Sequence, residues 1–300
     1  MTTFSVLLPI YKNDEFIIET FNSLLNQTFR DFEIIAVIDN LNTNIPDHIH
    51  NKFSKNPNYK KINFFEFSNM GLTKILNKGI SLAKGRYIVR NDSDDLSASN
   101  RLEKINNLIE KEKNIKLIYS HFHIIDTNSI KIKTKKPSYK GLELRKKLNF
   151  KNPIGHSTVT FHREFINNLG KYNEELKVSQ DYDLWSRVVN TDPDAVAFIK
   201  DTLVSIRYHK KSISESFSEN QRQNSVLIAM NNKFYPKKFN NKNNLMSNME
   251  NNYYIALKFA YLYGIKKQIR LNIASIYYLI LIYTHHKSLL IKRLLRIFKI

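Results

Sequence analysis

The sequence predicts an α/β fold with a doubly wound, mostly parallel, Rossmann-like sheet, and two observations lead to this prediction. Short apolar runs alternate with helical patterns between residues 4 and 112, which is the arrangement of βαβ units. Two of the apolar runs end in an aspartate, Asp39 and Asp92, and such a sheet delivers the carboxyl ends of its parallel strands to one edge. A ligand site is therefore expected at that edge.

The first half of the chain contains four predicted strands alternating with helices. The run Phe4–Ile10 is almost continuously apolar, as expected of a strand that is buried on both faces of a parallel sheet. Apolar residues recur at helical spacing in segment 16–25, and Asn13 is a candidate N-cap for this helix. The next predicted elements, in order, are strand 32–39, strand 62–67, helix 72–83, strand 87–89 and helix 100–112.

The second half is less regular and is expected to complete a domain that spans residues 1–215. In segment 178–188, Leu184, Trp185 and Val188 share a helical face, and the first turn of this predicted helix carries Asp181 and Asp183. The other predicted elements are a hairpin at 117–126 and 130–133, a short helix at 141–150, and strands at 158–161, 195–199 and 203–208.

The last part of the chain has a different composition. Residues 216–252 are rich in Asn and Lys and are interpreted as a linker with some helix. From Asn251 to the end there are nine Lys or Arg residues and no Asp or Glu. The longest uncharged apolar stretch there, residues 273–283, is about half of the roughly 20 residues that a spanning helix needs. Residues 253–300 are therefore expected to form basic amphipathic helices that lie on the globular body or on an anionic membrane.

Charge and composition narrow the class of partner. The balance of 47 basic to 27 acidic residues gives a net charge of +20, which favours anionic partners. Nucleic acid is not expected, because much of the excess lies in the tail and not on a folded body with interleaved aromatics. The chain contains no Cys, which excludes disulfides and cysteine-based zinc sites. No signal peptide is apparent, so the expected location is cytoplasmic and peripheral on the inner face of the cytoplasmic membrane.

Three carboxylates follow the strand predicted at residues 87–89. Asp92, Asp94 and Asp95 lie within four positions of one another, and a divalent cation is a common way to hold such closely spaced charges together. Hard oxygen ligands suit Mn²⁺ or Mg²⁺, which are usually shared with the phosphates of a substrate. A solvated acidic turn before the next helix would have the same composition. From these residues alone both interpretations stay open.

Four sequence strings, taken in order, resemble the inverting family 2 glycosyltransferases of the bacterial surface-polysaccharide type, which have the GT-A fold. The resemblance covers about the first 210 residues. It implies transfer of a sugar from a nucleotide diphosphate donor, usually UDP, to a hydroxyl of a cell-surface glycan or a lipid-linked oligosaccharide, with Mn²⁺ or Mg²⁺. The strings are SVLLPIY (5–11), SLLNQTFRDFEII (23–35), NDSDD (91–95) and QDYDLW (180–185).

The resemblance also implies roles for individual residues. Asp181 matches the general base of the family, and Asp94 matches a metal ligand. His209 resembles a basic motif that closes over the diphosphate or supplies a further metal ligand. Nucleotide-sugar contacts are implied for Pro9, Tyr11, Asp39, Asp92 and Asp95. On the acceptor side the resemblance points to His156, Trp185 and Asp183, the last of which is also the alternative base.

Structural roles compete with several of these assignments. An acid in the first turn of a helix is favoured by the helix dipole whatever its function, and a lone His is more often structural than a ligand. Trp185 also fits a core position. Two departures from the family pattern, Gln180 in place of Glu and Ile38 in place of an acid, bear on the nucleotide contacts and not on the reaction class.

Two other functions are compatible with parts of the sequence. A metal-dependent phosphoesterase would use the same aspartates, but it would leave Tyr11, Asp39 and Asp181 without a role. A basic module that binds lipid or nucleic acid would explain the charge and would not need the aspartates at all. Metal-dependent release of UDP from a nucleotide sugar separates both from a glycosyltransferase.

Overall fold

The computed structural model describes most of the first 209 residues. The chain divides into two compact units, Met1–Asn224 and Ser225–Ile300, and the described residues lie almost entirely in the first. Asn13, most of the linker and the whole basic tail fall outside them, so the predictions for those segments stay predictions. The described residues are 2–11, 15–41, 43–149, 151–209, 224, 225 and 228.

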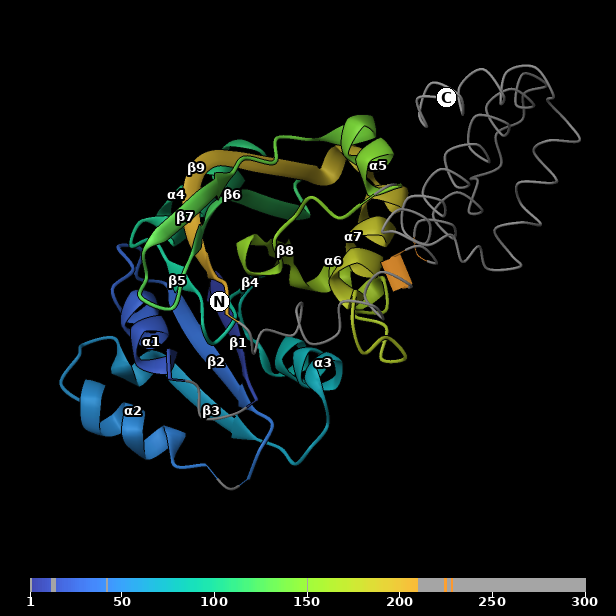
Figure 1. Cartoon of the computed structure of the whole chain (residues 1–300). Coiled ribbons are helices and arrows are strands. Elements are labelled where there is room, and N and C mark those ends of the chain that lie inside the picture. The colour runs from blue at the N-terminus through green and yellow to red at the C-terminus, as the bar shows by residue number, and fades with distance from the viewer. Residues whose placement is uncertain are drawn as a thin grey trace, which may run out of the picture. The chain divides into compact units, whose positions relative to one another are not determined.

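A nine-stranded mixed sheet runs through the first unit (Figure 1). Its order is β3-β2-β1-β4-β8-β6-β9-β5, and β7 pairs with β6 at the side of this path. The four strands from β3 to β4 are all parallel, as the alternating pattern predicted, and β6 is parallel to β9. The remaining pairings are antiparallel. The strands are β1 (Phe4–Ile10), β2 (Phe32–Ile38), β3 (Ile62–Glu66), β4 (Tyr87–Arg90), β5 (Leu96–Ser97), β6 (Leu117–Ile125), β7 (Lys131–Lys135), β8 (Thr160–His162) and β9 (Val196–Arg207).

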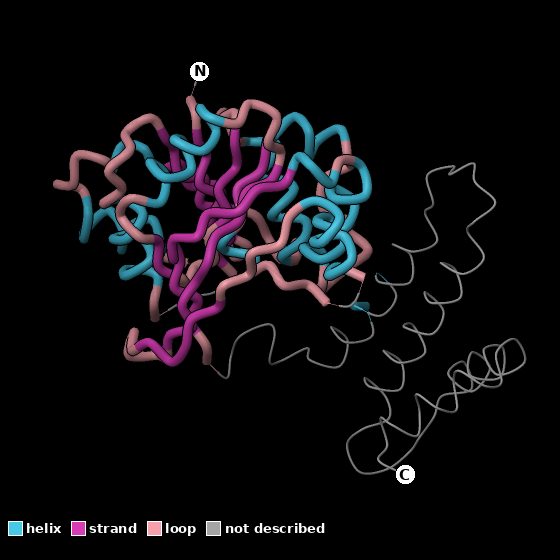
Figure 2. The backbone as a smooth tube through the Cα atoms, turned by 90° about the horizontal axis from the view of Figure 1, so that it is seen from above, coloured by secondary structure: helices cyan, strands magenta, loops and turns pink. Residues whose placement is uncertain are grey.

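Helices cover both faces of this sheet (Figures 1 and 2). None of the helices in the described part of the chain is long and apolar enough to cross a membrane. The α-helices are α1 (Ile17–Leu25), α2 (Ile45–Phe53), α3 (Leu72–Leu82), α4 (Arg101–Lys111), α5 (Gly141–Leu148), α6 (Arg163–Asn168) and α7 (Gln180–Thr191), and single 3₁₀ turns occur at η1 (Tyr59–Lys61), η2 (His156–Thr158) and η3 (Pro193–Ala195).

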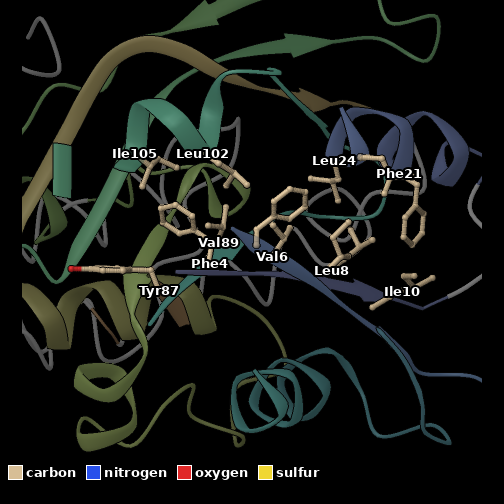
Figure 3. Close-up of a cluster of buried hydrophobic side chains, with 14 of the residues drawn as sticks. Phe4, Val6, Leu8, Ile10, Phe21, Leu24, Tyr87, Val89, Leu102 and Ile105 are labelled. Carbon is tan, nitrogen blue, oxygen red and sulfur yellow. The ribbon is translucent and has the colours of Figure 1, made fainter. Parts of the chain in front are cut away.

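β1 is buried along its whole length because it has a helical layer on each side. Alternate residues of the strand, Phe4 to Ile10, pack on Phe21 and Leu24 of α1 and on Leu102 of α4 (Figure 3). On the opposite face Leu7 lies against α3, where Gly79 leaves room for its methyl groups. The two faces explain why the sequence of this strand is apolar and not alternating.

Two parts of the second half differ from the prediction. The strands predicted at 195–199 and 203–208 are one strand, β9, because the exposed Lys200 and Asp201 form a bulge and not a turn: Ser120 of β6 faces Ile199, whereas His121 faces Thr202. The strand predicted at 158–161 begins later, since residues 156–158 form η2. Helices α2 and α6 were not predicted, and both are short.

Gly85 fixes the start of β4 against β1. Its amide donates to the Ser5 hydroxyl at 2.8 Å, and its carbonyl accepts from Arg163 Nε at 2.8 Å. A Cβ at this position would lie 2.5 Å from the backbone nitrogen of Ser5 and 2.6 Å from the carbonyl carbon of Phe4. Backbone atoms cannot move aside as a side chain can, so only glycine allows this approach of the two strands.

We expect Gly85→Ala to lower the free energy of unfolding by about 2 kcal/mol or more, since the new methyl group forces β1 and β4 apart. Gly170→Ala is the comparison, because it has open space but a φ of +84°, and it should cost about 1 kcal/mol. Urea unfolding of both variants measures the difference. A Gly85 variant as stable as the Gly170 variant would contradict the close approach.

Candidate active site

The acid loop, residues 91–95, leaves the carboxyl end of β4 and is held from inside by Asn91. The Asn91 side chain is fully buried. Its amide nitrogen donates to the carbonyl oxygens of Asp92 and Asp95 at 2.9 and 3.2 Å. Its amide oxygen accepts from the Ser97 hydroxyl at 2.9 Å and from Arg101 at 3.1 Å. The loop therefore has one fixed shape, and its three carboxylates are not on a loosely solvated turn.

Asp92 is ion-paired within this loop. Arg90 Nη2 donates to its Oδ1, and the Ser157 hydroxyl donates to its Oδ2 at 2.8 Å. Burial opposes ionisation of this carboxyl, but the adjacent Arg90 guanidinium lowers its pKa below the usual value. Asp92 is therefore an anion whose two oxygens are oriented before any ligand binds.

Arg90 itself is fully buried and reaches the other side of the site. Arg90 Nε lies 3.1 Å from Nε2 of His156. The Tyr172 hydroxyl lies 2.8 Å from this histidine nitrogen. Burial first, and then the positive charge of Arg90, lower the pKa of His156 to about 3. His156 is thus a neutral hydrogen-bond acceptor that orients Arg90, although it lies in the turn that was assigned to the acceptor side.

Asp94 pairs with a histidine that follows β9. Nε2 of His209 is 2.9 Å from Asp94 Oδ2, and both side chains are partly accessible to solvent. The His209 ring also lies against Phe16, with ring centroids 5.6 Å apart. The two residues that were predicted as metal ligands are therefore in direct contact, although 115 positions separate them in the sequence.

Asp95 is buried beneath the loop. Its Oδ1 accepts from the backbone amide of Arg207 at 2.8 Å. Burial, and then the charges of Asp94 and Asp92, raise the pKa of this carboxyl well above its usual value. Asp95 is only 2% exposed, and its hydrogen bond to Arg207 connects the acid loop to β9.

Two buried arginines hold the loop from behind, and sequence analysis gave them no role. Arg101 of α4 donates to the carbonyl oxygens of Arg90 and Ser157 at 2.9 and 2.6 Å. Arg207, at the end of β9, donates to the Asp94 carbonyl at 3.0 Å and pairs with Glu19 of α1 at 2.9 Å. The only sequence signal for either residue is a basic side chain beside predicted secondary structure, which is common on protein surfaces.

The residues predicted to contact the nucleotide lie at the ends of β1 and β2. The Asp39 carboxylate accepts from the amides of Met70 and Gly71 at 2.6 and 2.7 Å, so it holds the segment that leads into α3. Tyr11 directly follows β1 and is 54% exposed, whereas Pro9 is buried within that strand. Tyr11 thus offers an accessible ring, and Asp39 a carboxylate that is fixed in place.

Asp181 is the second residue of α7, and its pKa is affected by the charge of Asp92 in the acid loop. Its Oδ2 accepts from the Asn152 side chain at 2.8 Å. Burial raises the pKa of Asp181 to about 6, and the negative charge of Asp92 contributes to the increase. The structure therefore brings the predicted base into the electrostatic neighbourhood of the loop, with a pKa that suits proton transfer near neutral pH.

The two other α7 residues of interest point elsewhere. Asp183 accepts from Arg187 at 2.8 and 2.9 Å, and Arg187 also binds the Leu169 and Lys171 carbonyl oxygens at 2.6 Å. Trp185 is fully buried and packs against the rings of His156, Phe161 and Tyr172. Trp185 occupies the core position that was one of its two predicted roles, and the Asp183 carboxylate is engaged in an ion pair.

The side chains of Asp94 and His209 supply only part of the ligands that a hard divalent cation needs. Asp94 and His209 offer one carboxylate and one imidazole, both of which are ordinary ligands of Mn²⁺. Within the described residues no group of three or more His, Asp or Glu side chains is arranged to hold a metal ion. A cation at this position would therefore need further oxygen ligands from a bound substrate, as Mg²⁺ and Mn²⁺ sites that bind phosphates commonly do.

Comparisons with known proteins agree with this geometry. The model of "Glycosyl transferase family 2" matches residues 5–170. An uncharacterized glycosyltransferase of Methanocaldococcus jannaschii is 33% identical over 191 residues, which are 63% of this chain and 65% of that protein. The O-antigen biosynthesis glycosyltransferase WbnJ of Escherichia coli is 28% identical over 71% of this chain and 82% of that protein. The chain thus spans less than two thirds of the archaeal relative and 37% of a Rickettsia felis glycosyltransferase.

Solved structures share the fold at low sequence identity. S. aureus TarS 1-349 in complex with UDP has a TM-score of 0.61 and 15% identity, covering 89% of this chain and 73% of that one. GalNAc-T7 with UDP, GalNAc and Mn²⁺ has a TM-score of 0.55 and 16% identity, covering 76% of this chain and 48% of that one. These likenesses confirm the predicted GT-A fold. Since the family model covers more than half of the sequence, the chain belongs to glycosyl transferase family 2.

Proposed function

We propose that this protein is an inverting glycosyltransferase that moves a sugar from a UDP-linked donor to a hydroxyl of a cell-surface glycan or a lipid-linked oligosaccharide. The observation that carries the proposal is that two aspartates of the candidate site, Asp94 and Asp181, have different surroundings. Asp94 lies beside His209 on the acid loop, whereas Asp181 has a raised pKa and responds to the charge of that loop. Family membership and the name of the E. coli relative support the reaction class and the type of acceptor.

Donor binding is assigned to the strand ends and the acid loop. Tyr11 can stack on the uracil ring, and Pro9 is assigned to the same nucleotide-binding end of β1. Each oxygen of the Asp39 carboxylate has two lone-pair positions, so it can accept from the base while it still binds the amides of Met70 and Gly71. Asp92 is oriented by Arg90 to accept from the ribose, and Asp95 supports the loop from below.

Asp94 and His209 are the residues that would hold Mn²⁺ or Mg²⁺, together with oxygens of the donor diphosphate. When bound, the cation neutralises the charge that builds on the leaving nucleotide. The Mn²⁺ in the related fold of GalNAc-T7 is consistent with this assignment. The hydrogen bond between His209 and Asp94 holds the two side chains together.

Asp181 is assigned as the general base. Inversion requires a base that accepts the proton of the acceptor hydroxyl as its oxygen attacks the anomeric carbon. A carboxyl with a pKa of about 6 is mostly ionised at pH 7 and is more basic than an exposed aspartate. Asn152 donates to one of its oxygens, which fixes the orientation of the carboxylate.

Asp181→Asn should abolish sugar transfer while UDP binding is retained, because an amide cannot accept the proton. In the wild type, the rate of transfer should fall as the pH drops below about 6, since the base becomes protonated. A pH profile of transfer and calorimetry with UDP test both statements. Asp183→Asn removes the nearby ion pair with Arg187 instead, and loss of transfer in that variant alone would reassign the base.

Asp94→Asn should reduce metal-dependent release of UDP from nucleotide sugars by at least about a hundredfold, as expected when a group that stabilises developing charge is removed. A panel of UDP-sugars with Mn²⁺, Mg²⁺ or chelator identifies the donor in the same assay. Asp201→Asn is the matched control, because Asp201 is an exposed aspartate of β9 that pairs with Lys104 of α4. Equal activity of Asp94→Asn and Asp201→Asn would remove the metal assignment.

The basic tail, residues 253–300, is proposed to keep the enzyme at the inner face of the cytoplasmic membrane. The proposal rests on its sequence, which carries basic and no acidic side chains and favours an anionic leaflet. Deleting these residues should lower co-sedimentation with vesicles that contain phosphatidylglycerol. Unchanged co-sedimentation of the truncated protein would contradict a role of the tail in membrane binding.

A further inference from the structure

The β6–β7 hairpin presents an unusual surface, which we call the basic hairpin and define as residues 127–136. Ile130 and Ile132 are 62% and 54% exposed. Four exposed lysines alternate with them or follow them in the sequence, and the segment contains no acid. The lysines are Lys131, Lys133, Lys135 and Lys136.

Hydrogen bonds within the turn of the hairpin hold the backbone around Ile130 in place. The Asp126 carboxylate accepts from the amides of Asn128 and Ile130 at 2.9 and 2.8 Å, and the Asp126 amide donates to the Ile130 carbonyl at 3.0 Å. Arg207 Nη1 binds the carbonyl oxygens of Asp126 and Thr127 at 3.1 and 3.2 Å. The turn cannot bury Ile130 without breaking these bonds.

Protection of a sheet edge explains the lysines but not the isoleucines. β7 pairs only with β6 among the described strands (Figure 1), and lysines on such an edge commonly prevent association with another strand. Large aliphatic side chains at the same edge have the opposite effect. The pairing register shifts between Ile124 and Ile125, which face Lys133 and Lys131, so Ile132 lies at an irregularity of the ladder.

We propose that the basic hairpin docks on an anionic phospholipid bilayer. Lysines attract the negative leaflet, and the isoleucines gain free energy only in a partner with an apolar layer beneath its charges. A soluble polyanion supplies the first interaction and not the second. This contact goes beyond glycosyl transfer, and it involves the folded body and not the basic tail.

The contact would orient the active site. Arg207 connects the turn of the hairpin to the acid loop, because its Nε binds the Asp94 carbonyl at 3.0 Å and its Nη1 binds the Ser129 hydroxyl at 3.1 Å. A hairpin seated on the leaflet therefore holds the acid loop close to the membrane surface. A hydroxyl of a lipid-linked acceptor would then lie at the same distance from the membrane surface as the acid loop.

A fluorescent probe on the full-length protein tests the contact directly. The chain has no Cys, so Asn128→Cys introduces a single thiol at the exposed turn, which is labelled with an environment-sensitive nitrobenzoxadiazole dye. Vesicles that contain equal parts of phosphatidylcholine and phosphatidylglycerol should shift its emission to the blue. The matched control is Asn107→Cys, on the exposed side of α4, whose emission should not change.

Two sets of substitutions separate charge from insertion. Replacing Lys131, Lys133 and Lys135 by Gln should weaken vesicle binding by at least about tenfold, since each lysine near an anionic leaflet contributes about fivefold. The control changes the same charge on and after α4, at the exposed Lys104, Lys111 and Lys113. The double substitution Ile130→Ser and Ile132→Ser should weaken vesicle binding but not binding to inorganic polyphosphate, whereas Leu142→Ser, at a residue that is 63% exposed, should change neither.

The outcomes are distinct from those of the transferase assay, since no nucleotide sugar is present. A blue shift at position 128 that is lost in the triple lysine variant supports the proposal. Co-sedimentation without a shift at position 128 overturns it and leaves membrane binding to the tail. Vesicle binding that is insensitive to the isoleucine substitutions, with strong binding to polyphosphate, also overturns it and indicates a soluble polyanion.

Discussion

The guanidinium group of Arg207 connects the parts of the chain that form the site. It lies 4.2 Å from the Phe16 ring centroid, pairs with Glu19 and binds carbonyl oxygens of the acid loop and of the β6–β7 turn. A buried guanidinium is costly unless its donors are satisfied. Here Nε binds the acid loop, Nη1 binds the turn of the hairpin and Nη2 binds Glu19 of α1. Removal of this one side chain would therefore break the contacts to all three segments.

The acids of the loop differ because their surroundings differ. Asp92 faces Arg90 and has a lowered pKa, whereas Asp95 has a raised pKa because it is buried and lies close to the charges of Asp94 and Asp92. Asp94 is left at the surface beside His209. Three aspartates within four positions thus supply one oriented anion, one structural support and one partly accessible carboxylate.

The acids of the candidate site could be proposed from the sequence, whereas most of their supports could not. Asp39, Asp92 and Asp94 were found because they end apolar strands, and the carboxyl ends of parallel strands converge. Arg101 and Arg207 were missed as supports, because Arg101 connects the loop to Ser157, 56 positions away, and Arg207 binds Asp94 across 113 positions. The same limit applies to β9: Lys200 and Asp201 indicate a turn locally, and only the pairing with β6 shows that the strand continues through a bulge.

The order in which the chain is synthesised adds a consequence of the Arg207 contacts. Segments that meet early, such as β1, β2 and β4, are complete once about the first third of the chain exists, and domains begin to fold from the N-terminus during translation. The acid loop must then wait for a residue 113 positions later before its Asp94 carbonyl is bound. A nascent chain that stops before β9 would lack Arg207 and His209, so Asp94 would have neither the bond to its carbonyl oxygen nor the contact to its carboxylate.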